Sequence, residues 1–383
     1  MNIKNKRIVL ISRFPNDIDR PRGGVETATV GLARALIDAG ATDLHVVTLE
    51  ADRHEHEVTN YNGIQVHRLR RSRFPMLLDV FVGPTQRRLK KYLDELKPDI
   101  LHFQETWGFG SFRYGKPVLF TVHGFDSLNL VTEKKSLWRL RAKLWSIAEA
   151  FALSKQNSIV SIAPYVRRMI EPHTSAPIHD IWNALDKDYF EITRSEKPGY
   201  LLFIGWINPR KNPLILVDIA AKLKSKHPNL LIELCGEEDD EAYALSIKQR
   251  IIELNVENHI KLVGRVGQLS VREKLSRASI MVLPSLQENA PMAIAEAMAA
   301  RVPCVVANRC GMPDMVSQGE TGYLCDPYDV DCLTKHIDSL LSDDNQRQRI
   351  GKSAHGASYS KFHPSSVARQ TLKVYQDLLQ NTP

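Results

Sequence analysis

The fold of this chain is decided by one stretch, Pro284-Ser285-Leu286-Gln287-Glu288-Asn289-Ala290-Pro291-Met292-Ala293-Ile294-Ala295-Glu296-Ala297-Met298-Ala299-Ala300. Short apolar runs typical of strands lie before it at 279–283 and after it at 301–307. The order strand, loop, helix, strand is the βαβ pattern of a parallel sheet. Asn289 is a favourable N-cap, and Pro291 suits the first helical turn, where its missing N–H costs nothing. We therefore expect a helix of small residues close to a parallel sheet.

The start of this helix has the chemistry of a sugar-nucleotide site. Free N–H groups and the helix dipole attract anions, and Pro291 has no N–H, so Met292 and Ala293 are expected to face phosphate. Glu288 and Glu296 stand beside that point, and carboxylates accept hydrogen bonds from sugar hydroxyls. Glu residues are usually exposed to solvent, so two of them at a fixed spacing do not by themselves indicate a binding site. The residues around them must supply that evidence.

Those surroundings carry a resemblance to a known family. The pattern runs from Pro284-Ser285 through Glu288 and Glu296, spaced E-x7-E, to Gly311-Met312-Pro313-Asp314 and Gly319-Glu320-Thr321-Gly322. It resembles the donor half of the family 4 retaining glycosyltransferases, whose fold is GT-B. The resemblance implies an α/β protein with two Rossmann-like, doubly wound parallel-sheet domains facing each other across a cleft. It places the acceptor domain at 1–190, the donor domain at 191–361, and a final helix at 362–380 that crosses back to the first domain.

The resemblance also implies roles for individual residues. The catalytic group would comprise His123, Glu288 and Lys211, with Asp126 on the acceptor side. Lys211 matches the Lys of the family's Gly-Arg-x4-Lys loop, but Trp206 stands where the Arg belongs, so Arg210 is the candidate for the missing charge. The donor would be bound by Gly23, Gly24, Arg210, Lys211, Arg265, Asn289, Ala290, Pro291, Met292, Ala293 and Glu296.

The implied reaction is sugar transfer from a nucleoside-diphosphate sugar with retention of configuration and without a metal or other cofactor. UDP is the first expectation for the donor and GDP, as in GDP-mannose, the second. The expected acceptor is a glycan or lipid-linked molecule of cell-envelope polysaccharide or lipopolysaccharide synthesis. Two other classes stay open: a sugar-nucleotide epimerase or phosphorylase, and a binding module without turnover. A phosphorylase should carry a lysine context for pyridoxal phosphate, which is not found.

The composition of the chain indicates the cellular compartment in which it works. The chain has 383 residues, 43% of them hydrophobic, and no apolar run approaches the ~20 residues of a membrane helix. The five cysteines fall in the second half, and their spacing suggests no zinc site. Reduced thiols in a cytoplasmic protein are therefore expected.

The positive charge is concentrated in the first half. Residues 1–195 contain 29 Lys and Arg against 22 Asp and Glu, which accounts for the whole net charge of +7. Two basic segments, 67–91 and 134–145, also carry apolar side chains, including Phe74, Met76, Leu77, Leu78, Val80 and Phe81 in the first. They favour either docking to an anionic membrane surface, on the inner face of the cytoplasmic membrane, or an ordinary solvated face. No nucleic-acid motif is present, so nucleic acid is not an expected partner.

Strand patterns complete the prediction. Apolar runs predict strands at 7–12, 44–49, 64–69, 99–103, 118–122, 158–162 and 178–182, and again at 200–204, 230–235 and 259–263.

Overall fold

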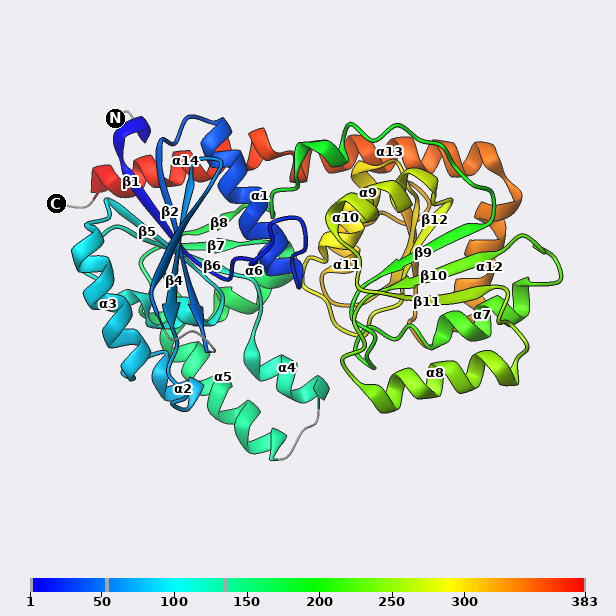
Figure 1. Cartoon of the computed structure of the whole chain (residues 1–383), viewed down its shortest axis with the longest axis horizontal. Helices are drawn as coiled ribbons and strands as arrows, with labels where there is room; N and C mark the ends of the chain where they lie inside the picture. Colours follow the sequence, from blue (N-terminus) through cyan, green and yellow to red (C-terminus); the bar gives the residue numbers. More distant parts are fainter. Residues whose placement is uncertain (1–2, 52–54, 134–136, 382–383) are drawn as a thin grey trace. The chain divides into compact units, whose positions relative to one another are not determined.

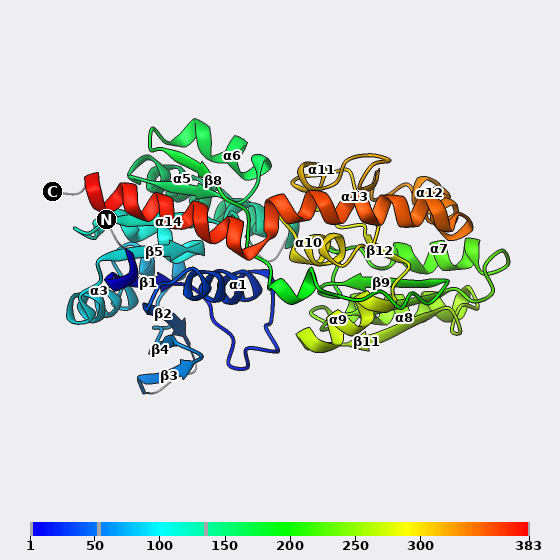
Figure 2. The same cartoon turned by 90° about the horizontal axis from the view of Figure 1, so that it is seen from above.

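The computed structural model describes residues 3–51, 55–133 and 137–381, which form two compact units (Figure 1). The first unit contains Met1–Ile18, Gly24–Ala184 and Pro364–Pro383, and the second contains Asp19–Gly23 and Leu185–His363. Each unit is built on one sheet with helices packed on its faces (Figure 2). The predicted α/β class with two parallel-sheet domains is confirmed.

The sheet of the first unit has the strand order β3-β4-β2-β1-β5-β6-β7-β8. All its pairings are parallel except that of β3 with β4. Its strands are β1 (Arg7–Ile11), β2 (Asp43–Glu50), β3 (Glu57–Tyr61), β4 (Ile64–Arg70), β5 (Ile100–Gln104), β6 (Val118–Val122), β7 (Ile159–Ser161) and β8 (Ile178–Asp180).

The helices of the first unit are α1 (Gly24–Asp38), α2 (Met76–Asp79), α3 (Pro84–Leu96), α4 (Asp126–Glu133), α5 (Trp138–Ser154), α6 (Pro164–Ile170) and α14 (Pro364–Asn381), with short 3-10 helices η1 (Ile3–Asn5), η2 (Glu105–Arg113) and η3 (Glu171–His173). The last helix packs on α1. A buried hydrogen bond of 2.7 Å joins His102 Nδ1 in β5 to the Tyr375 hydroxyl in α14. The end of the chain is therefore part of the first unit's core.

One strand of this sheet has no apolar signal. The residues of β3 are mostly exposed, because it is an edge strand, and no strand was predicted there. Its connection to β4 did carry a signal, since Asn62-Gly63 adopts φ values of 52° and 90°. Positive φ at both positions is the requirement of a tight hairpin turn, which Asn-Gly meets. The antiparallel edge is thus explained by its turn.

The sheet of the second unit is parallel throughout, with the order β11-β10-β9-β12-β13-β14. Its strands are β9 (Tyr200–Ile204), β10 (Leu231–Cys235), β11 (Ile260–Gly264), β12 (Ile280–Leu283), β13 (Cys304–Ala307) and β14 (Gly322–Cys325). Its helices are η4 (Lys187–Tyr189), α7 (Ile215–Leu223), α8 (Glu241–Glu253), α9 (Gln268–Arg277), α10 (Met292–Ala299), α11 (Met312–Met315), α12 (Val330–Ser342) and α13 (Asp344–Phe362).

Both sheets contain a topological switch point. The chain leaves β1 towards β2 on one side and later adds β5 on the other, and β9 has β10 and β12 as its two neighbours in the same way. In open α/β sheets, ligands bind outside the carboxyl ends of the strands at such a point. The loops after β1 and β5, and those after β9 and β12, are therefore the first places to look for a site.

The cysteine expectation is wrong for two of the five residues. Cys325 at the end of β14 and Cys332 in the first turn of α12 form a disulfide, while Cys235, Cys304 and Cys310 are free. The two partners are seven residues apart, with Cα atoms 6.0 Å from each other. They meet because the chain turns sharply between the strand and the helix.

Candidate functional site

Two loops of the second unit meet at its switch point. The loop after β9 contains Arg210 and Lys211, and the loop after β12 contains Glu288. Leu286 N–H donates to the Arg210 carbonyl over 2.7 Å and joins the loops directly. The four residues of β12 are fully buried, so the loop that follows starts from a rigid element.

The side chains of these loops converge on Glu288. Lys211 Nζ contacts Glu288 Oε1, and Arg210 Nη1 lies 3.3 Å from the same oxygen. Arg210 also donates to the Gln287 carbonyl over 3.0 Å. Burial lowers the pKa of Lys211, and the Glu288 carboxylate opposes that shift. The arrangement is a buried carboxylate held by two cations.

Hydrogen bonds fix the position of Lys211 within its loop. Lys211 N–H donates to Asn208 Oδ1 over 3.1 Å, and Asn208 Nδ2 donates to Asp239 over 3.1 Å. Asn212 adopts a φ of 55°, and its side chain donates to the Pro327 carbonyl over 2.8 Å. The acidic loop at 237–241 thus helps to hold the lysine loop in place.

The helix after Glu288 is α10, which begins at Met292 with Pro291 as its N-cap. The prediction of Asn289 as N-cap is wrong, because the loop stays extended through Pro291, whose ψ is 123°. Within the described residues, the helix's hydrogen bonds to Pro291 O start at Ile294, and the N–H groups of Met292 and Ala293 donate to no protein acceptor. Two donors at a helix N-terminus are thus available to an anion.

A glycine sets the shape of the loop between β12 and α10. Gly311 N–H donates to the Glu288 carbonyl over 2.9 Å. A Cβ atom on Gly311 would lie 1.7 Å from the Asn289 carbonyl oxygen, so only glycine permits this approach. The glycine of the sequence pattern therefore holds the segment that carries Glu288, Asn289 and Ala290.

Glu296 lies on the buried face of α10, next to Tyr189 of η4. Burial raises the pKa of Glu296 to about 7, and the Tyr189 hydroxyl opposes this shift. Burial raises the pKa of Tyr189, and Glu296 adds to that effect. Tyr189 was not predicted, because its segment reads as a linker in the sequence.

Two further predicted donor residues lie in the second unit. Arg265 follows β11, and its Nη2 donates to the Arg20 carbonyl. Gly23 belongs to the same unit, where a Cβ atom on it would lie 3.9 Å from Trp206 Nε1. Gly24, by contrast, is the first residue of α1 in the first unit.

His123 directly follows β6 in the first unit. Its Nε2 lies 2.8 Å from Gln104 Oε1, and an amide oxygen only accepts, so the proton is on Nε2. Burial lowers the pKa of His123 to about 4. The imidazole is therefore neutral near pH 7.

Sequence reasoning missed Glu105, the first residue after β5. Its side chain is 12% exposed, its φ is 60°, and Arg13 Nε lies 3.2 Å from its carboxylate. Burial raises its pKa to about 7, with Arg13 opposing and Asp126 adding to the shift. A charged residue directly after a buried strand was the signal that could have identified it. Asp126, at the start of α4, accepts a hydrogen bond of 2.8 Å from Thr106 Oγ1.

Glu105 lines a cavity of about 90 Å³ at the switch point of the first sheet. Arg13 after β1 and Arg71 after β4 contribute guanidinium groups to its wall. In the described residues, the side chain of Arg71 makes no ion pair, and its hydrogen-bond partner is the Met76 sulfur, at 3.9 Å. The cavity therefore offers two cations and one carboxyl group to a polar ligand.

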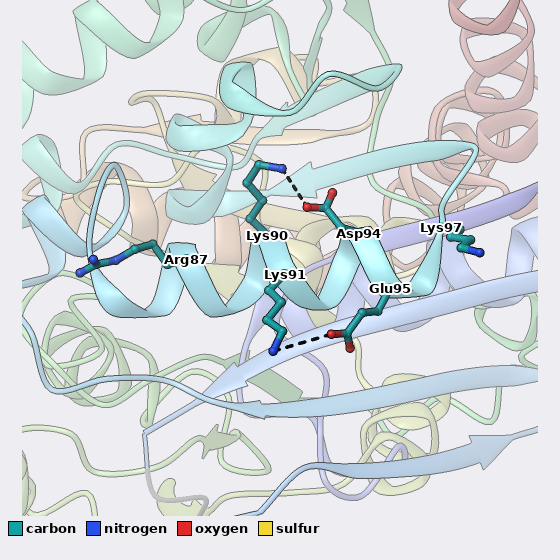
Figure 3. A pocket seen from close by; sticks show the side chains of 6 residues that line it. All are labelled: Arg87, Lys90, Lys91, Asp94, Glu95 and Lys97. Carbon is teal, nitrogen blue, oxygen red and sulfur yellow. Dashed lines mark hydrogen bonds and ion pairs between the residues drawn. The ribbon is translucent and has the colours of Figure 1, made fainter.

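A second hollow lies on α3 and is lined by Arg87, Lys90, Lys91, Asp94, Glu95 and Lys97 (Figure 3). Lys90 pairs with Asp94 over 2.9 Å and Lys91 with Glu95 over 4.0 Å. All six side chains come from one helix and its C-cap, and four of them neutralise each other. This hollow has no convergent groups for a ligand.

The basic segment at 67–91 exposes less positive charge and less apolar surface to solvent than its sequence suggests. Arg68 is buried, pairs with Glu50 over 2.6 Å and donates to the Pro15 carbonyl over 2.7 Å. Val80 is fully buried, whereas Phe74, Leu78 and Val82 are exposed. In the segment 134–145, residues 134–136 lie outside the described part of the chain.

Two family descriptions match the chain, one over each half. Residues 22–189 match the family described as "Glycosyltransferase Family 4", and residues 186–356 match "Glycosyl transferases group 1". An N-acetyl-alpha-D-glucosaminyl L-malate synthase from Bacillus anthracis is 29% identical over 197 residues, 51% of this chain and 49% of that protein. The match thus spans about half of that relative.

Solved structures share the whole fold. Sucrose-phosphate synthase from Thermosynechococcus elongatus has a TM-score of 0.83 at 19% identity, covering 98% of this chain and all of that one. HepE from Anabaena, in complex with UDP and glucose, has a TM-score of 0.74 at 16% identity, covering 97% of this chain and all of that one. The predicted GT-B fold is confirmed.

Proposed function

The chain belongs to the group 1 glycosyl transferases of glycosyltransferase family 4, and from this premise we propose that it moves a sugar from a nucleoside-diphosphate sugar to a glycan or lipid-linked acceptor. The observation that carries the proposal is the meeting of Lys211, Arg210 and Glu288 at the switch point of the second sheet. The processes it would serve are the synthesis of cell-envelope polysaccharide or lipopolysaccharide.

The second unit supplies the groups that a departing diphosphate needs. Lys211 and Arg210 provide positive charge, and the N–H groups of Met292 and Ala293 provide donors at a helix N-terminus. Preorganised donors of this kind stabilise charge as it develops in the transition state. The resemblance assigns Asn289, Ala290, Pro291, Gly23, Gly24 and Arg265 to the same donor. No divalent ion is required in this scheme.

Carboxyl groups would recognise the two sugars of the donor by accepting hydrogen bonds from their hydroxyl groups. Glu288 would accept from hydroxyls of the transferred sugar once the diphosphate draws Lys211 and Arg210 towards itself. Glu296 would bind the ribose hydroxyls, with Tyr189 beside it. UDP is our first choice of nucleotide and GDP the second. The UDP complex of HepE, which has the same fold, supports that order.

The first unit would hold the acceptor. Its cavity at Glu105, Arg13 and Arg71 lies outside the carboxyl ends of the strands, as the site of an α/β sheet should. His123 would donate its Nε2 proton to an oxygen of a substrate when it exchanges its bond with Gln104. Asp126 would orient the acceptor side of the site.

The reaction would proceed on one face of the sugar. The bond from the anomeric carbon to the phosphate oxygen breaks, and the bond to the acceptor oxygen forms on the same side. The acceptor's proton passes to the departing phosphate oxygen. Retention of configuration follows, and no protein carboxylate is needed as a covalent nucleophile.

A membrane surface is the partner we propose for the first unit. Five exposed apolar side chains on or next to α5 follow a spacing of three and four residues, which puts them on one helix face: Leu137, Leu140, Leu144, Ile147 and Phe151. Exposed Arg139, Arg141 and Lys143 lie on the same helix. Apolar and basic side chains together suit an anionic leaflet. Within residues 3–51, 55–133 and 137–381, no helix combines the length and hydropathy needed to cross a bilayer.

The deciding experiment has two steps. A thermal-shift titration with UDP, GDP and ADP should show stabilisation by one nucleotide, because a ligand that binds only the folded state raises its stability. The matching nucleotide sugar should then release nucleoside diphosphate only when an acceptor is added, and the product's anomeric proton coupling should match the donor's. Release of nucleoside diphosphate without an acceptor would argue against sugar transfer. A new sugar epimer would favour the epimerase, and binding without turnover would favour the binding module.

A further inference from the structure

A cluster of metal-binding side chains lies in the second unit apart from the residues assigned to sugar transfer. One sulfur from Cys325, one from Cys332 and one ring nitrogen of His336 all lie within 4.8 Å of one another. Cys325 is buried, and the other two are half-buried, so an ion has a path from solvent. In the described residues this is the one group of three or more such ligands that could hold a metal ion.

Rigid elements position all three ligands. Cys325 ends β14, which pairs with β13 along its length. Cys332 and His336 lie four residues apart on α12, so they share one helix face. The Asp329 side chain accepts from Cys332 N–H over 2.9 Å and caps the helix. Placement of Cys332 in the first helical turn also favours its thiolate form.

The chemistry of the set selects the metal. Two thiolates and an imidazole are typical ligands of Zn²⁺. Hard cations such as Mg²⁺ and Ca²⁺ prefer carboxylate oxygens, and this set of three ligands contains none. The His336 ring stacks on Tyr323 with centroids 4.1 Å apart and planes inclined by 16°, which fixes its orientation. Three protein ligands leave a fourth position for water or another ligand.

We propose that Cys325, Cys332 and His336 form a Zn²⁺ site that alternates with the Cys325–Cys332 disulfide. A dithiol reductant would deliver two electrons to the disulfide, becoming a disulfide itself while its two protons pass to the cysteine sulfurs. Binding of Zn²⁺ would then release those two protons as the thiolates and the neutral imidazole coordinate. The bond between the sulfurs and the bound ion therefore exclude each other.

The segment closed by either state touches the loop of Lys211. Pro327, between the two cysteines, accepts the 2.8 Å hydrogen bond from Asn212, the residue after Lys211. Arg309, next to Cys310, lies over the ring of Tyr328 in the same segment. The zinc site would therefore stabilise a segment that contacts the Lys211 loop directly and the loop after β13, in which Gly311 donates to the Glu288 carbonyl.

The test uses cobalt as a spectroscopic probe for the full-length protein. A thiol titration in denaturant should find three thiols before reduction and five after, given the three free cysteines. The reduced protein should then bind Co²⁺ with a thiolate charge-transfer band in the near ultraviolet and intense d–d bands in the visible. Zn²⁺ should displace the cobalt and bleach both.

Variants separate the ligands from the fold. Cys332→Ser should weaken the charge-transfer band, and His336→Gln should raise the Kd for Zn²⁺ at least about tenfold, the effect expected when a site loses an interaction that supports the metal. Cys310→Ser, which removes a free thiol outside the cluster, should change neither; circular dichroism should show all three folded. Absence of cobalt binding by the reduced protein, or equal Zn²⁺ affinity in His336→Gln and the unaltered chain, would overturn the proposal.

Discussion

Lys211 Nζ contacts Glu288 Oε1 inside the second unit, and the two side chains are only 12% and 10% exposed. Such an enclosed ion pair is favourable only while both partners remain, because removal of one leaves an uncompensated buried charge. A bound diphosphate would bring new negative charge to Lys211 and free Glu288 to accept hydrogen bonds from sugar hydroxyls. In the proposed reaction, the pair would therefore couple donor binding to recognition of the transferred sugar.

Replacement of either partner should impair transfer. Lys211→Ala and Glu288→Gln should each lower kcat by at least about tenfold, since each removes a group that acts on the departing diphosphate or the sugar. Initial-rate assays with the nucleotide identified by thermal shift provide the measurement. Lys248→Ala is the matched control, because Lys248 pairs with Glu238 on the exposed surface of the same unit. Near-normal turnover in both site variants would overturn the site assignment.

The buried carboxyl of Glu296 should make stability depend on pH. Folded Glu296 keeps its proton up to about pH 7, whereas its ordinary pKa is 4.5. Unfolding therefore releases a proton between those values, and the folded state loses stability as pH rises through that range. Glu296→Gln should remove this loss, so its advantage over the unaltered chain should grow from pH 5 to pH 8, by up to about 3 kcal/mol.

Urea unfolding curves at four pH values would measure that difference. Glu273→Gln, an exposed change on α9 of the same unit, should leave the pH dependence as it is. A constant difference between Glu296→Gln and the unaltered chain across the range would show that Glu296 is ionised in the folded state.

Glu105 should affect the acceptor more than the donor. Glu105→Gln removes the carboxylate that faces Arg13 in the first unit, so the KM for the acceptor should rise about tenfold, as expected when a charged partner is lost. The KM for the nucleotide sugar should stay within about twofold, since the second unit would hold the donor. Glu95→Gln on α3 is the control. An equal rise in both KM values would contradict an acceptor role.

The apolar face of α5 should direct membrane binding. The protein should float with vesicles of phosphatidylglycerol and not with vesicles of phosphatidylcholine, because anionic lipids attract Arg139, Arg141 and Lys143. Ile147→Ser combined with Leu144→Ser should abolish flotation. Leu245→Ser, at an exposed apolar position on α8 of the second unit, should not. No preference for anionic vesicles would refute the membrane proposal.

Metal removal should leave sugar transfer intact. In the proposed site, Lys211, Arg210 and the N–H groups at the start of α10 would stabilise the negative charge that a divalent ion neutralises in other enzymes. For the protein with the Cys325–Cys332 disulfide, which holds no zinc, we therefore expect turnover in EDTA within about twofold of turnover in magnesium. A large loss that Mg²⁺ or Mn²⁺ restores would show that the reaction needs an ion at the diphosphate.

Local patterns were sufficient for most of the fold. Apolar runs located β1, β9 and β12 to within a residue or two, because strands buried on both faces contain few polar residues. The run from Glu288 to Glu296 correctly predicted a loop followed by a helix. Elements without a buried face were missed: β3 is an exposed edge, and only its Asn62-Gly63 turn marked it.

The sequence identified candidate site residues but not the contacts between them. The pattern singled out Lys211 and Glu288, but their direct ion pair depends on β9 and β12 being neighbours in the sheet. Tyr189 was missed because its segment reads as a linker, and Glu105 was missed although it directly follows the apolar run of β5. The helix start also differed, because an extended Pro291 took the N-cap from Asn289.

The sequence by itself determined the periodicity of the elements, the family and most of the residues expected to bind the donor, because these depend on neighbours along the chain. The tertiary structure alone decided which distant residues meet: Lys211 with Glu288, Glu105 with Arg13, and Cys325 with Cys332 and His336. Strand order, burial and sharp turns control those meetings. The resulting charges, proton affinities and ligand sets are properties of the packed chain, since burial and close partners change the chemistry of each group.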